Sequence, residues 1–372
     1  MADRGRRVLI TGISNPVSCQ LASRLEADEG VEYVAGVDLV EPEAPLERTE
    51  FIRADLRSPL VAKVIESTRV DTLVHLGITT TPGQVGGRSR MKELNVIGAM
   101  QLLAAAQKAP RLRNVVVRST TAVYGSHYRN PSLIPEDVAT DAPPRSGYAK
   151  DAVEIETYAR GLSRRRPDLT MTILRLANTV GPTVDTPLTK YFALPVVPTV
   201  LGYDPRLQLL HEDDAVGALE RATVDPHPGI YNVAGPGVIY LSQAIRIAGK
   251  VAVPLARPLM PWLAGMLRQS GRVDFAADQL QFLLYGRVGD ITRLRERFGY
   301  EPRYSTREAL EAFLEGQGIE RLLEPEAVAA AERELLAALR RLRPADEAAS
   351  SSEQAGAPGA GGSPSSEQEV RT

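Results

Sequence analysis

A turn near the N-terminus carries residue types that suit the binding of a phosphate group. The apolar strand Val8 to Ile10 runs into the segment Thr11-Gly12-Ile13-Ser14-Asn15-Pro16-Val17-Ser18, and a helical pattern follows. In a dinucleotide-binding turn, glycines make the bend, let the backbone approach the pyrophosphate and let helix and strand pack closely. Here Gly12 fills one of these places, while Asn15 tolerates positive φ and can cap the helix. We expect Gly12, Ser14 and Asn15 to face the anion; the alternative is a capped helix start that binds no ligand.

Two carboxylates follow this turn in the order that a dinucleotide site needs. Asp38 ends a predicted strand over Tyr33 to Val37 and lies 26 residues after Gly12, the expected reach for a carboxylate that accepts from both ribose hydroxyls. A carboxylate there repels a 2′-phosphate, so it favours NAD over NADP. Asp55 follows the third strand, where its side chain could meet the adenine. Each aspartate alone is more commonly an exposed loop residue, but together they indicate a cofactor site.

The composition excludes several other kinds of chemistry. The 372 residues include 44 Lys and Arg against 46 Asp and Glu, a net charge of −2, which argues against a nucleic-acid binder because that class needs a concentrated positive surface. The single cysteine, Cys19, excludes an intramolecular disulfide. Four scattered histidines give poor support for a zinc site. Any chemistry must therefore come from hydroxyls, carboxylates and a bound cofactor.

Strand-like and helix-like segments alternate through the first half of the chain. After the first strand, the predicted helices cover residues 17–26, 61–67, 91–108 and 148–165, and the predicted strands cover 33–37, 71–76, 114–118 and 171–176. This alternation predicts an α/β fold, a doubly wound parallel sheet of the Rossmann type with helices on both faces. Beyond Gly181 the pattern is broken and rich in Pro and Gly, which indicates a smaller C-terminal lobe of loops and short helices.

A series of short motifs follows this pattern along the chain. They are Thr11-Gly12, Asp38, Asp55-Leu56, Val74-His75-Leu76-Gly77, Asn95-Val96-Ile97-Gly98, Ser119-Thr120-Thr121-Ala122-Val123-Tyr124-Gly125, Tyr148, Leu174-Arg175-Leu176-Ala177-Asn178-Thr179-Val180-Gly181-Pro182, His211-Glu212-Asp213-Asp214 and Tyr231-Asn232-Val233-Ala234-Gly235. Together they resemble the extended short-chain dehydrogenase/reductase group and its NAD-dependent epimerase/dehydratase family, whose best-known member type is UDP-glucose 4-epimerase. The resemblance covers roughly residues 7–315 and is closer still to actinobacterial proteins similar to that epimerase.

The resemblance implies NAD as the cofactor and a nucleotide sugar as the substrate. In the family, a tyrosine and a serine or threonine flank the substrate carbinol, which assigns the acid/base role to Tyr148 and the hydroxyl partner to Thr120. Asn178, Arg206 and His211 match positions near the substrate, although Arg206 also suits a surface charge and His211 a helix cap or a core histidine. The cofactor residues that the resemblance adds are Leu56, Leu76, Gly77 and Asn95.

The family's lysine, four residues after the tyrosine, is absent because position 152 is alanine. The base must be partly ionised near neutral pH, whereas a tyrosine with a reference pKa of about 10 is phenolate in about one molecule in a thousand at pH 7. A nearby ammonium changes that, and so does oxidised nicotinamide, which is itself cationic. Lys150 lies roughly 200° around the helix from Tyr148 and should point away. Lys190 or Arg118 could approach only through the fold.

Two interpretations therefore stay open. The first is an NAD-dependent enzyme of the epimerase/dehydratase type that acts on a nucleotide sugar or related carbinol, supported by Asp38, Thr120, Tyr148 and Asn178. The second is a catalytically lapsed scaffold or sensor of the same fold that binds NAD(H) or nothing, which the altered glycines and Ala152 favour. A reductase that uses NADPH comes third, and Asp38 argues against it.

The predicted domain organisation follows from the resemblance and from composition. Residues 1–182, with returning segments near 211–235, form an NAD-binding Rossmann domain, and residues 183–323 form the substrate lobe. A last helix is predicted over 324–343. Residues 344–372 are mostly Ala, Ser, Gly, Pro and Glu, with one valine and no aromatic residue, which predicts a disordered tail.

The sequence also carries predictions about location and assembly. The apolar run Val8 to Ile10 is too short for a secretory signal, and the apolar stretch Pro258 to Leu267 is too short for a membrane span, so we expect a cytoplasmic protein. The helices near 91–108 and 148–165 match those that pair in family dimers. The resemblance therefore implies a homodimer.

Overall fold

The computed structural model describes residues 5–138, 143–145, 147–269 and 277–319, together with positions 330 and 334. The chain divides into two compact units, Met1–Pro325 and Glu326–Thr372, and every element named below belongs to the first. The helix predicted over 324–343 lies outside the described residues except at those two positions. The tail predicted over 344–372 lies wholly outside them.

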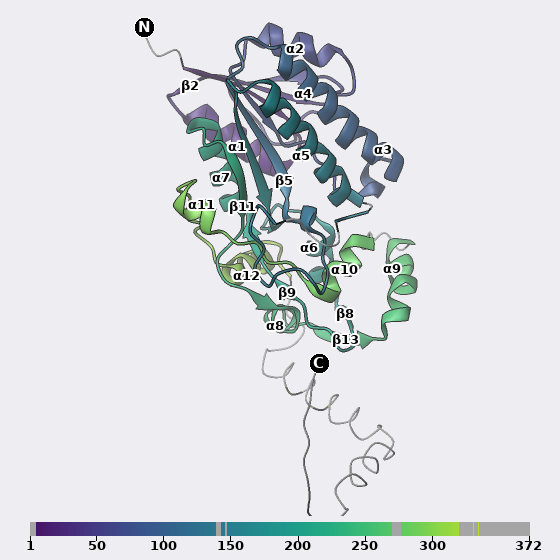
Figure 1. The fold of residues 1–372 in the computed structure, drawn as a ribbon. Coiled ribbons are helices and arrows are strands. Elements are labelled where there is room, and N and C mark those ends of the chain that lie inside the picture. Colours follow the sequence, from purple (N-terminus) through teal and green to yellow (C-terminus); the bar gives the residue numbers. More distant parts are fainter. Residues whose placement is uncertain are drawn as a thin grey trace, which may run out of the picture. The chain divides into compact units, whose positions relative to one another are not determined.

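The centre of the first unit is a sheet of seven parallel strands, shown in Figure 1. Its order is β11-β6-β5-β4-β1-β2-β3, so the chain reverses direction across the sheet between β1 and β4. Ligands bind at such a switch point in doubly wound folds, outside the carboxyl ends of the strands. The strands are β1 (Arg6–Thr11), β2 (Val31–Asp38), β3 (Thr49–Arg53), β4 (Thr72–His75), β5 (Asn114–Thr120), β6 (Thr170–Leu176) and β11 (Gly229–Val233).

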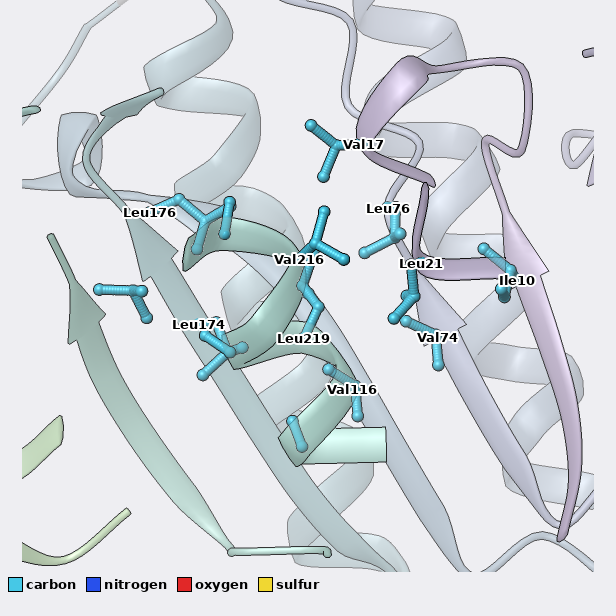
Figure 2. Packing of buried hydrophobic residues seen from close by; sticks show 14 of the residues in the cluster. Ile10, Val17, Leu21, Val74, Leu76, Val116, Leu174, Leu176, Val216 and Leu219 are labelled. Carbon is cyan, nitrogen blue, oxygen red and sulfur yellow. The ribbon is translucent and has the colours of Figure 1, made fainter. Parts of the chain in front are cut away.

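Helices cover both faces of this sheet because its central strands are apolar on both sides. Val8 and Ile10 of β1 point into one core and Leu9 between them into the other, as strand alternation requires. Figure 2 shows the first core, where Val216 and Leu219 lie over the strands. The first core lies under α1 (Pro16–Ala27), α7 (Glu212–Val224) and α11 (Thr292–Glu296), and the second under α2 (Leu60–Thr68), α4 (Gly98–Lys108) and α5 (Gly147–Arg165).

The helix predicted over 91–108 is longer and less regular than expected. It begins at Arg88 as α3 (Arg88–Lys92), passes through a π-helical turn, η2 (Glu93–Ile97), and continues as α4. The polar residue at the centre of the π turn is Asn95, which is fully buried and hydrogen-bonded. Turns of this kind recur at functional sites, and the periodicity of the sequence did not reveal this one.

The C-terminal lobe contains short strands as well as the predicted short helices. Strands of two to five residues give too short an alternation to be found in a sequence. The lobe has its own hydrophobic core, which includes Phe192, Leu207 and Phe313. Its elements are β7 (Asn178–Val180), α6 (Pro187–Ala193), β8 (Val196–Val200), β9 (Arg206–Leu207), β10 (Leu209–His211), β12 (Ile239–Tyr240), α8 (Leu241–Ile247), β13 (Val251–Leu255), η4 (Arg257–Leu259), α9 (Met260–Gln269), α10 (Ala277–Tyr285) and α12 (Thr306–Gly316). Two short turns belong to the part of the chain that forms the central sheet: η1 (Pro82–Val85) follows β4, and η3 (Thr121–Tyr124) follows β5.

Two properties of the described residues bear on function. None of their helices combines the length and the apolar character that a membrane crossing requires. Within the same part of the chain, no three or more His, Cys, Asp and Glu side chains gather in a way that could hold a metal ion.

Candidate functional site

A cleft of about 580 Å³ opens at the carboxyl ends of the central strands, where the switch point lies. Its lining comes from the loops after β1, β2, β3, β4, β5 and β6, from the start of α5 and from α10. Residues far apart in the sequence therefore meet at one edge of the sheet. The predicted site residues that line it are Gly12, Ser14, Asn15, Asp38, Asp55, Leu56, Leu76, Gly77, Thr120, Tyr148 and Asn178.

Two loops touch through their glycines beside this cleft. Gly12 has φ +77°, a conformation that L residues with a side chain rarely adopt. A Cβ atom on Gly12 would lie 2.6 Å from the Cα of Gly77, closer than real Cβ contacts come. The bend after β1 therefore requires glycine both for its torsion and for the close approach of the loop after β4.

Asn15 caps α1, as the sequence predicts. Its side-chain oxygen accepts a hydrogen bond of 3.0 Å from the Val17 N–H, and Pro16 occupies the first turn. Asn15 has φ −73°, so in this turn the positive φ falls on Gly12 and not on Asn15. Because Pro16 has no N–H and the cap uses that of Val17, the helix start keeps few backbone donors. The Asn15 amide group and the helix dipole are left to attract an anion.

Asp38 is held in place by Ser14. One carboxylate oxygen accepts from the Ser14 hydroxyl at 2.6 Å and from the Ser14 N–H at 3.1 Å, and the other accepts from the Leu39 N–H at 2.7 Å. Carboxylate oxygens have further lone pairs, so each can still accept from a ribose hydroxyl. The sequence predicts a place for Ser14 near a phosphate; in the structure Ser14 binds the Asp38 carboxylate.

Asp55 lines the cleft but is paired with Arg57. The Arg57 guanidinium donates to both carboxylate oxygens, with a shortest distance of 2.6 Å, and also contacts Glu93. Hydrogen bonding from Arg57 keeps the pKa of Asp55 below its usual value. Asp55 is therefore ionised, and the paired Arg57 guanidinium largely compensates its charge.

Three of the predicted site residues do not line the cleft. Asn95 is fully buried and exchanges two hydrogen bonds of 2.9 Å with the backbone of Thr79. His211 is 4% exposed, accepts from the Asp213 N–H as the cap of α7, and stacks on Tyr304. Arg206 lies in the short strand β9, away from the cleft lining. The cap, which the sequence left open as the alternative for His211, is the arrangement found.

Thr120 and Tyr148 line the cleft from different elements. Thr120 ends β5, and its hydroxyl oxygen accepts from the Ala122 N–H at 3.1 Å, which fixes its orientation and leaves its proton available to donate. Tyr148 is the second residue of α5 and is 9% exposed. The two residues thus bring a hydroxyl group and a phenol to the lining of one cleft.

The cations that could replace the missing lysine differ in whether they line the cleft. Ala152 is 1% exposed and packs with Val123, Tyr124 and Ile134. Lys190 forms an ion pair of 3.0 Å with Asp185 and is not part of the cleft lining, and neither is Lys150. Arg118, two residues before Thr120 on β5, does line the cleft with Tyr148.

Arg287 is a second arginine in the cleft, which the sequence analysis did not single out. It donates hydrogen bonds to the Ser126 hydroxyl at 3.2 Å and the Thr121 hydroxyl at 3.4 Å, and lies 5.1 Å from the centre of the Phe282 ring. It reaches the site from the segment after α10, more than 160 residues beyond its hydroxyl partners. No local spacing could have linked them.

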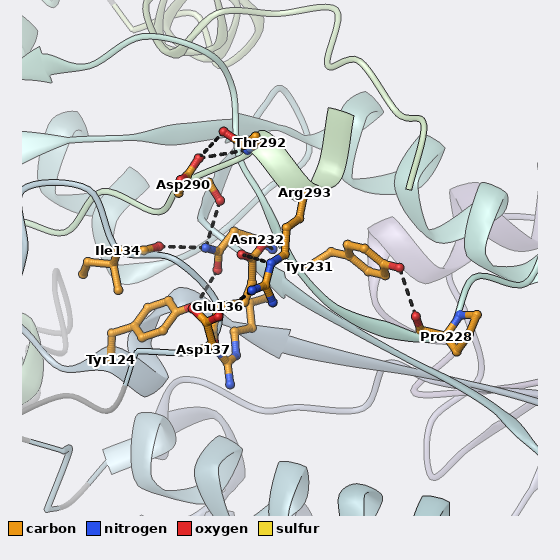
Figure 3. Close-up of polar contacts among 11 residues, drawn as sticks. Tyr124, Ile134, Glu136, Asp137, Pro228, Tyr231, Asn232, Asp290, Thr292 and Arg293 are labelled. Atoms are coloured by element: carbon orange, nitrogen blue, oxygen red, sulfur yellow. Dashed lines mark hydrogen bonds and ion pairs between the residues drawn. The ribbon is translucent and has the colours of Figure 1, made fainter. Parts of the chain in front are cut away.

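The motif residues Tyr124 and Arg175 belong to a buried network beside the cleft. The Arg175 guanidinium binds both oxygens of Glu156, at 2.7 and 2.8 Å, and donates to the Tyr124 hydroxyl at 2.8 Å. Tyr124 donates to Asn232, whose neighbours in the network appear in Figure 3. Burial raises the pKa of Tyr124. These motif residues therefore join β5, α5, β6 and β11, and do not line the cleft themselves.

The fold and this cleft define a doubly wound α/β protein with a ligand site at the switch point. Residues 8–234 match the NAD-dependent epimerase/dehydratase family, and the chain belongs to that family. The prediction of the family and of its cofactor, NAD, is thus confirmed at the level of the family.

Relatives and solved structures agree with this assignment. An uncharacterized protein of Mycobacterium tuberculosis is 44% identical over 326 residues, which are 86% of each chain. A dTDP-glucose 4,6-dehydratase of Streptomyces venezuelae, solved with NAD bound, has a TM-score of 0.66 at 22% identity over 86% of this chain and 99% of that one. UDP-glucose 4-epimerase of Thermotoga maritima, solved with UDP-glucose, has a TM-score of 0.64 at 20% identity over 83% and 97%. The predicted Rossmann-type fold is therefore confirmed.

Proposed function

We propose that this protein binds NAD in the cleft and catalyses reversible hydride transfer at a carbinol of a nucleotide sugar. One observation carries the proposal: Gly12 and Asp38 on one side, and Thr120 and Tyr148 on the other, line a single cleft at the switch point. A lapsed site would have no reason to keep the hydroxyl, the phenol and the ribose carboxylate together. The cleft volume also lies in the range of small-molecule sites, about 300–1,000 Å³.

The residues that line the cleft fit NAD. The close approach of Gly12 and Gly77 brings bare backbone to the cleft, where a pyrophosphate would lie beside the Asn15 amide. Asp38, held by Ser14, would accept from the ribose hydroxyls and repel the 2′-phosphate of NADP. The family membership supports the same cofactor. When bound, NAD supplies the group that accepts a hydride and gives it back.

Tyr148 is the acid/base in this proposal. Its phenolate oxygen takes the proton of the substrate hydroxyl as the carbinol is oxidised to a ketone, and its phenol returns a proton when the ketone is reduced. Thr120 donates its free hydroxyl proton to the same substrate oxygen, because its own oxygen is already engaged by the Ala122 N–H. Return of the hydride to the opposite face of the ketone would give an epimer. A dehydratase product would need loss of water from the carbons next to the ketone, followed by return of the hydride to the unsaturated sugar.

The substrate side of the cleft offers polar groups for a nucleotide sugar. Asn178 lines the cleft, and among the described residues its side-chain amide makes no hydrogen bond. Arg287 also lines it and brings a positive charge. We propose that these two side chains contact the diphosphate, since arginine and amide donors suit phosphate oxygens.

Calorimetry and turnover assays test the proposal. We expect NAD to bind at least tenfold more tightly than NADP, and turnover of UDP-glucose, UDP-galactose, UDP-glucuronate or dTDP-glucose to be lost in Tyr148→Phe. Lys150→Met serves as the matched control, because Lys150 lies two residues further on α5 and outside the cleft lining. Absence of heat with NAD and NADH would exclude the proposal and leave a scaffold that binds no nucleotide. Binding without turnover of any nucleotide sugar would favour the lapsed NAD(H)-binding scaffold.

We also propose a cytoplasmic homodimer that pairs through α4 and α5. These two helices lie side by side on one face of the sheet (Figure 1), as in the pairing that the family resemblance implies. Light scattering of the full chain tests the dimer: a mass of about 80 kDa, twice the 40.3 kDa of one chain, is expected. A mass near 40 kDa would contradict it.

A further inference from the structure

The positive charge beside Tyr148 comes from an unexpected place in the chain. We propose that the Arg118 guanidinium stabilises the Tyr148 phenolate and so takes the place of the lysine that Ala152 replaces. This inference rests on the proposed function for its catalytic meaning. The effect of the Arg118 charge on the ionisation of Tyr148 can be measured in the free protein, without cofactor or substrate.

Arg118 lies near the carboxyl end of β5, where the cleft opens, and Arg118, Ser119 and Thr120 all belong to its lining. Successive side chains of a strand point to opposite faces, so Arg118 and Thr120 lie on the same side of β5. Ser119, between them, donates to buried Glu156 at 2.6 Å. Tyr148 lines the same cleft. Thr120, which is proposed to bind the substrate hydroxyl, and Arg118, the proposed cation, thus both come from the end of β5.

The Arg118 guanidinium is not engaged elsewhere in the described part of the chain. No hydrogen bond or ion pair joins it to another described residue; its one charge interaction is with Tyr148. Partial burial acts to lower the pKa of Arg118, and the Tyr148 phenol opposes this. An arginine stays protonated in proteins, so a full positive charge, with no carboxylate partner among the described residues, lies in the same cleft as the phenol.

The other charged groups around Tyr148 are either compensated or outside the cleft. A cation whose charge a carboxylate already balances acts weakly on a third group. Asp38 and Asp55, the acidic residues on the far wall, are held by Ser14 and Arg57. On the near side, Arg88 binds both oxygens of Asp151, Lys190 pairs with Asp185, Arg287 bonds to the Thr121 and Ser126 hydroxyls, and Lys150 does not line the cleft.

The position of Tyr148 in its helix acts in the same direction. Tyr148 is the second residue of α5, a helix of 19 residues, where the positive end of the helix dipole favours an anion. The dipole alone contributes modestly, whereas a full charge within about 4–6 Å changes ionisation by tenfold or more. Arginine also differs from lysine in one respect that matters here: its charge does not titrate between pH 6 and 11.

Titration of Tyr148 in the free protein tests the proposal directly. The chain has 12 tyrosines, and the Tyr148 signal of protein labelled with ¹³C at tyrosine Cζ is assigned by its absence in Tyr148→Phe. We expect the phenolate fraction at pH 8 to fall at least tenfold in Arg118→Met and to return most of the way in Arg118→Lys. Lys150→Met, the matched control on α5, should leave the titration of Tyr148 unchanged.

Each outcome decides the proposal. An unchanged Tyr148 titration in Arg118→Met, or a larger change in Lys150→Met, would overturn it. If Arg118→Met fails to fold, Arg118→Lys and the parent are compared instead. The proposal is supported if Tyr148 titrates in Arg118→Lys as it does in the parent. It is overturned if Tyr148 in the parent titrates like an exposed tyrosine. No substrate or cofactor takes part in this titration. A parent protein without turnover would therefore contradict the proposed function, and the Tyr148 titration would still test the role of Arg118. In an active parent, loss of Arg118 should lower kcat more at pH 7 than at pH 10, with little change in KM.

Discussion

The Ser14 hydroxyl lies 2.6 Å from a carboxylate oxygen of Asp38, so the turn after β1 and the end of β2 are linked before any cofactor binds. A carboxylate that is already oriented loses less freedom when it accepts from a ribose. The pair therefore prepares one half of the cleft for its ligand.

Removing this contact should weaken cofactor binding without unfolding the protein. We expect NAD affinity to fall by about tenfold in Ser14→Ala, since a hydrogen bond to a charged group contributes about 1.5–3 kcal/mol. Calorimetry measures the affinity. Ser58→Ala removes a hydroxyl outside the cleft lining and should bind NAD like the parent; equal affinities in both variants would show that Asp38 needs no help from Ser14.

Gly12 and Gly202 form a matched pair for testing the close approach of the two loops. Both have positive φ, +77° and +82°, but a Cβ at Gly202 meets nothing within 4 Å, whereas at Gly12 it meets the Gly77 backbone at 2.6 Å. Gly202→Ala should cost about 1 kcal/mol of unfolding free energy, the strain of the torsion. Gly12→Ala should cost at least about 1 kcal/mol more and remove NAD binding. Urea unfolding and calorimetry compare the two, and equal losses would contradict the proposed contact.

The buried ion pair of Arg175 and Glu156 should be a large contributor to stability once one partner is lost. The side chains are 8% and 2% exposed, and Arg175→Met leaves the Glu156 carboxylate buried without its main partner. We expect a loss of about 3–5 kcal/mol in urea unfolding. Arg307→Met breaks an exposed pair with Glu311 and should cost under about 0.5 kcal/mol. A small loss in Arg175→Met would mean that the network relaxes around the vacancy.

His75 predicts a dependence of stability on pH. Burial lowers its pKa to about 4, from 6.5 in the unfolded chain. Between these values the unfolded state binds a proton that the folded state does not, so unfolding free energy should fall as pH drops from 6.5 to 4, by about 3 kcal/mol in total, and change no further below 4 through this residue. The difference in pH dependence between the parent and His75→Gln measures the effect.

The sequence predicted what periodicity and order along the chain encode. The doubly wound sheet, the Asn15 cap and the succession of Gly12, Asp38 and Asp55 all depend on neighbours in sequence, and the structure contains each of them. Arg118 illustrates the limit. The sequence could name it beside Lys150 and Lys190, but only the pairing of β5 with the rest of the sheet, and the position of α5, shows which cation reaches the phenol.

The positions of three other residues relative to the cleft depend on features that a sequence does not show. Asn95 and His211 have polar side chains that suit a ligand, but the same donors and acceptors satisfy buried backbone groups equally well. Arg287 was missed because a segment after α10 folds back onto the loop after β5. Contacts of such long range follow from the whole fold.

The π turn at Asn95 has a consequence for motion in the cleft. Asn95 holds Thr79, in the loop after β4, and its amide also donates to Asp151 of α5 at 3.1 Å. Asp151 in turn binds Arg88, which donates to the carbonyl of Gly147, the residue before Tyr148. An unbroken chain of hydrogen bonds thus ties the cofactor-side loop to the helix start that carries the phenol. The loop after β4 and the start of α5 are therefore linked, so a displacement of one should be transmitted to the other through Asn95 and Asp151.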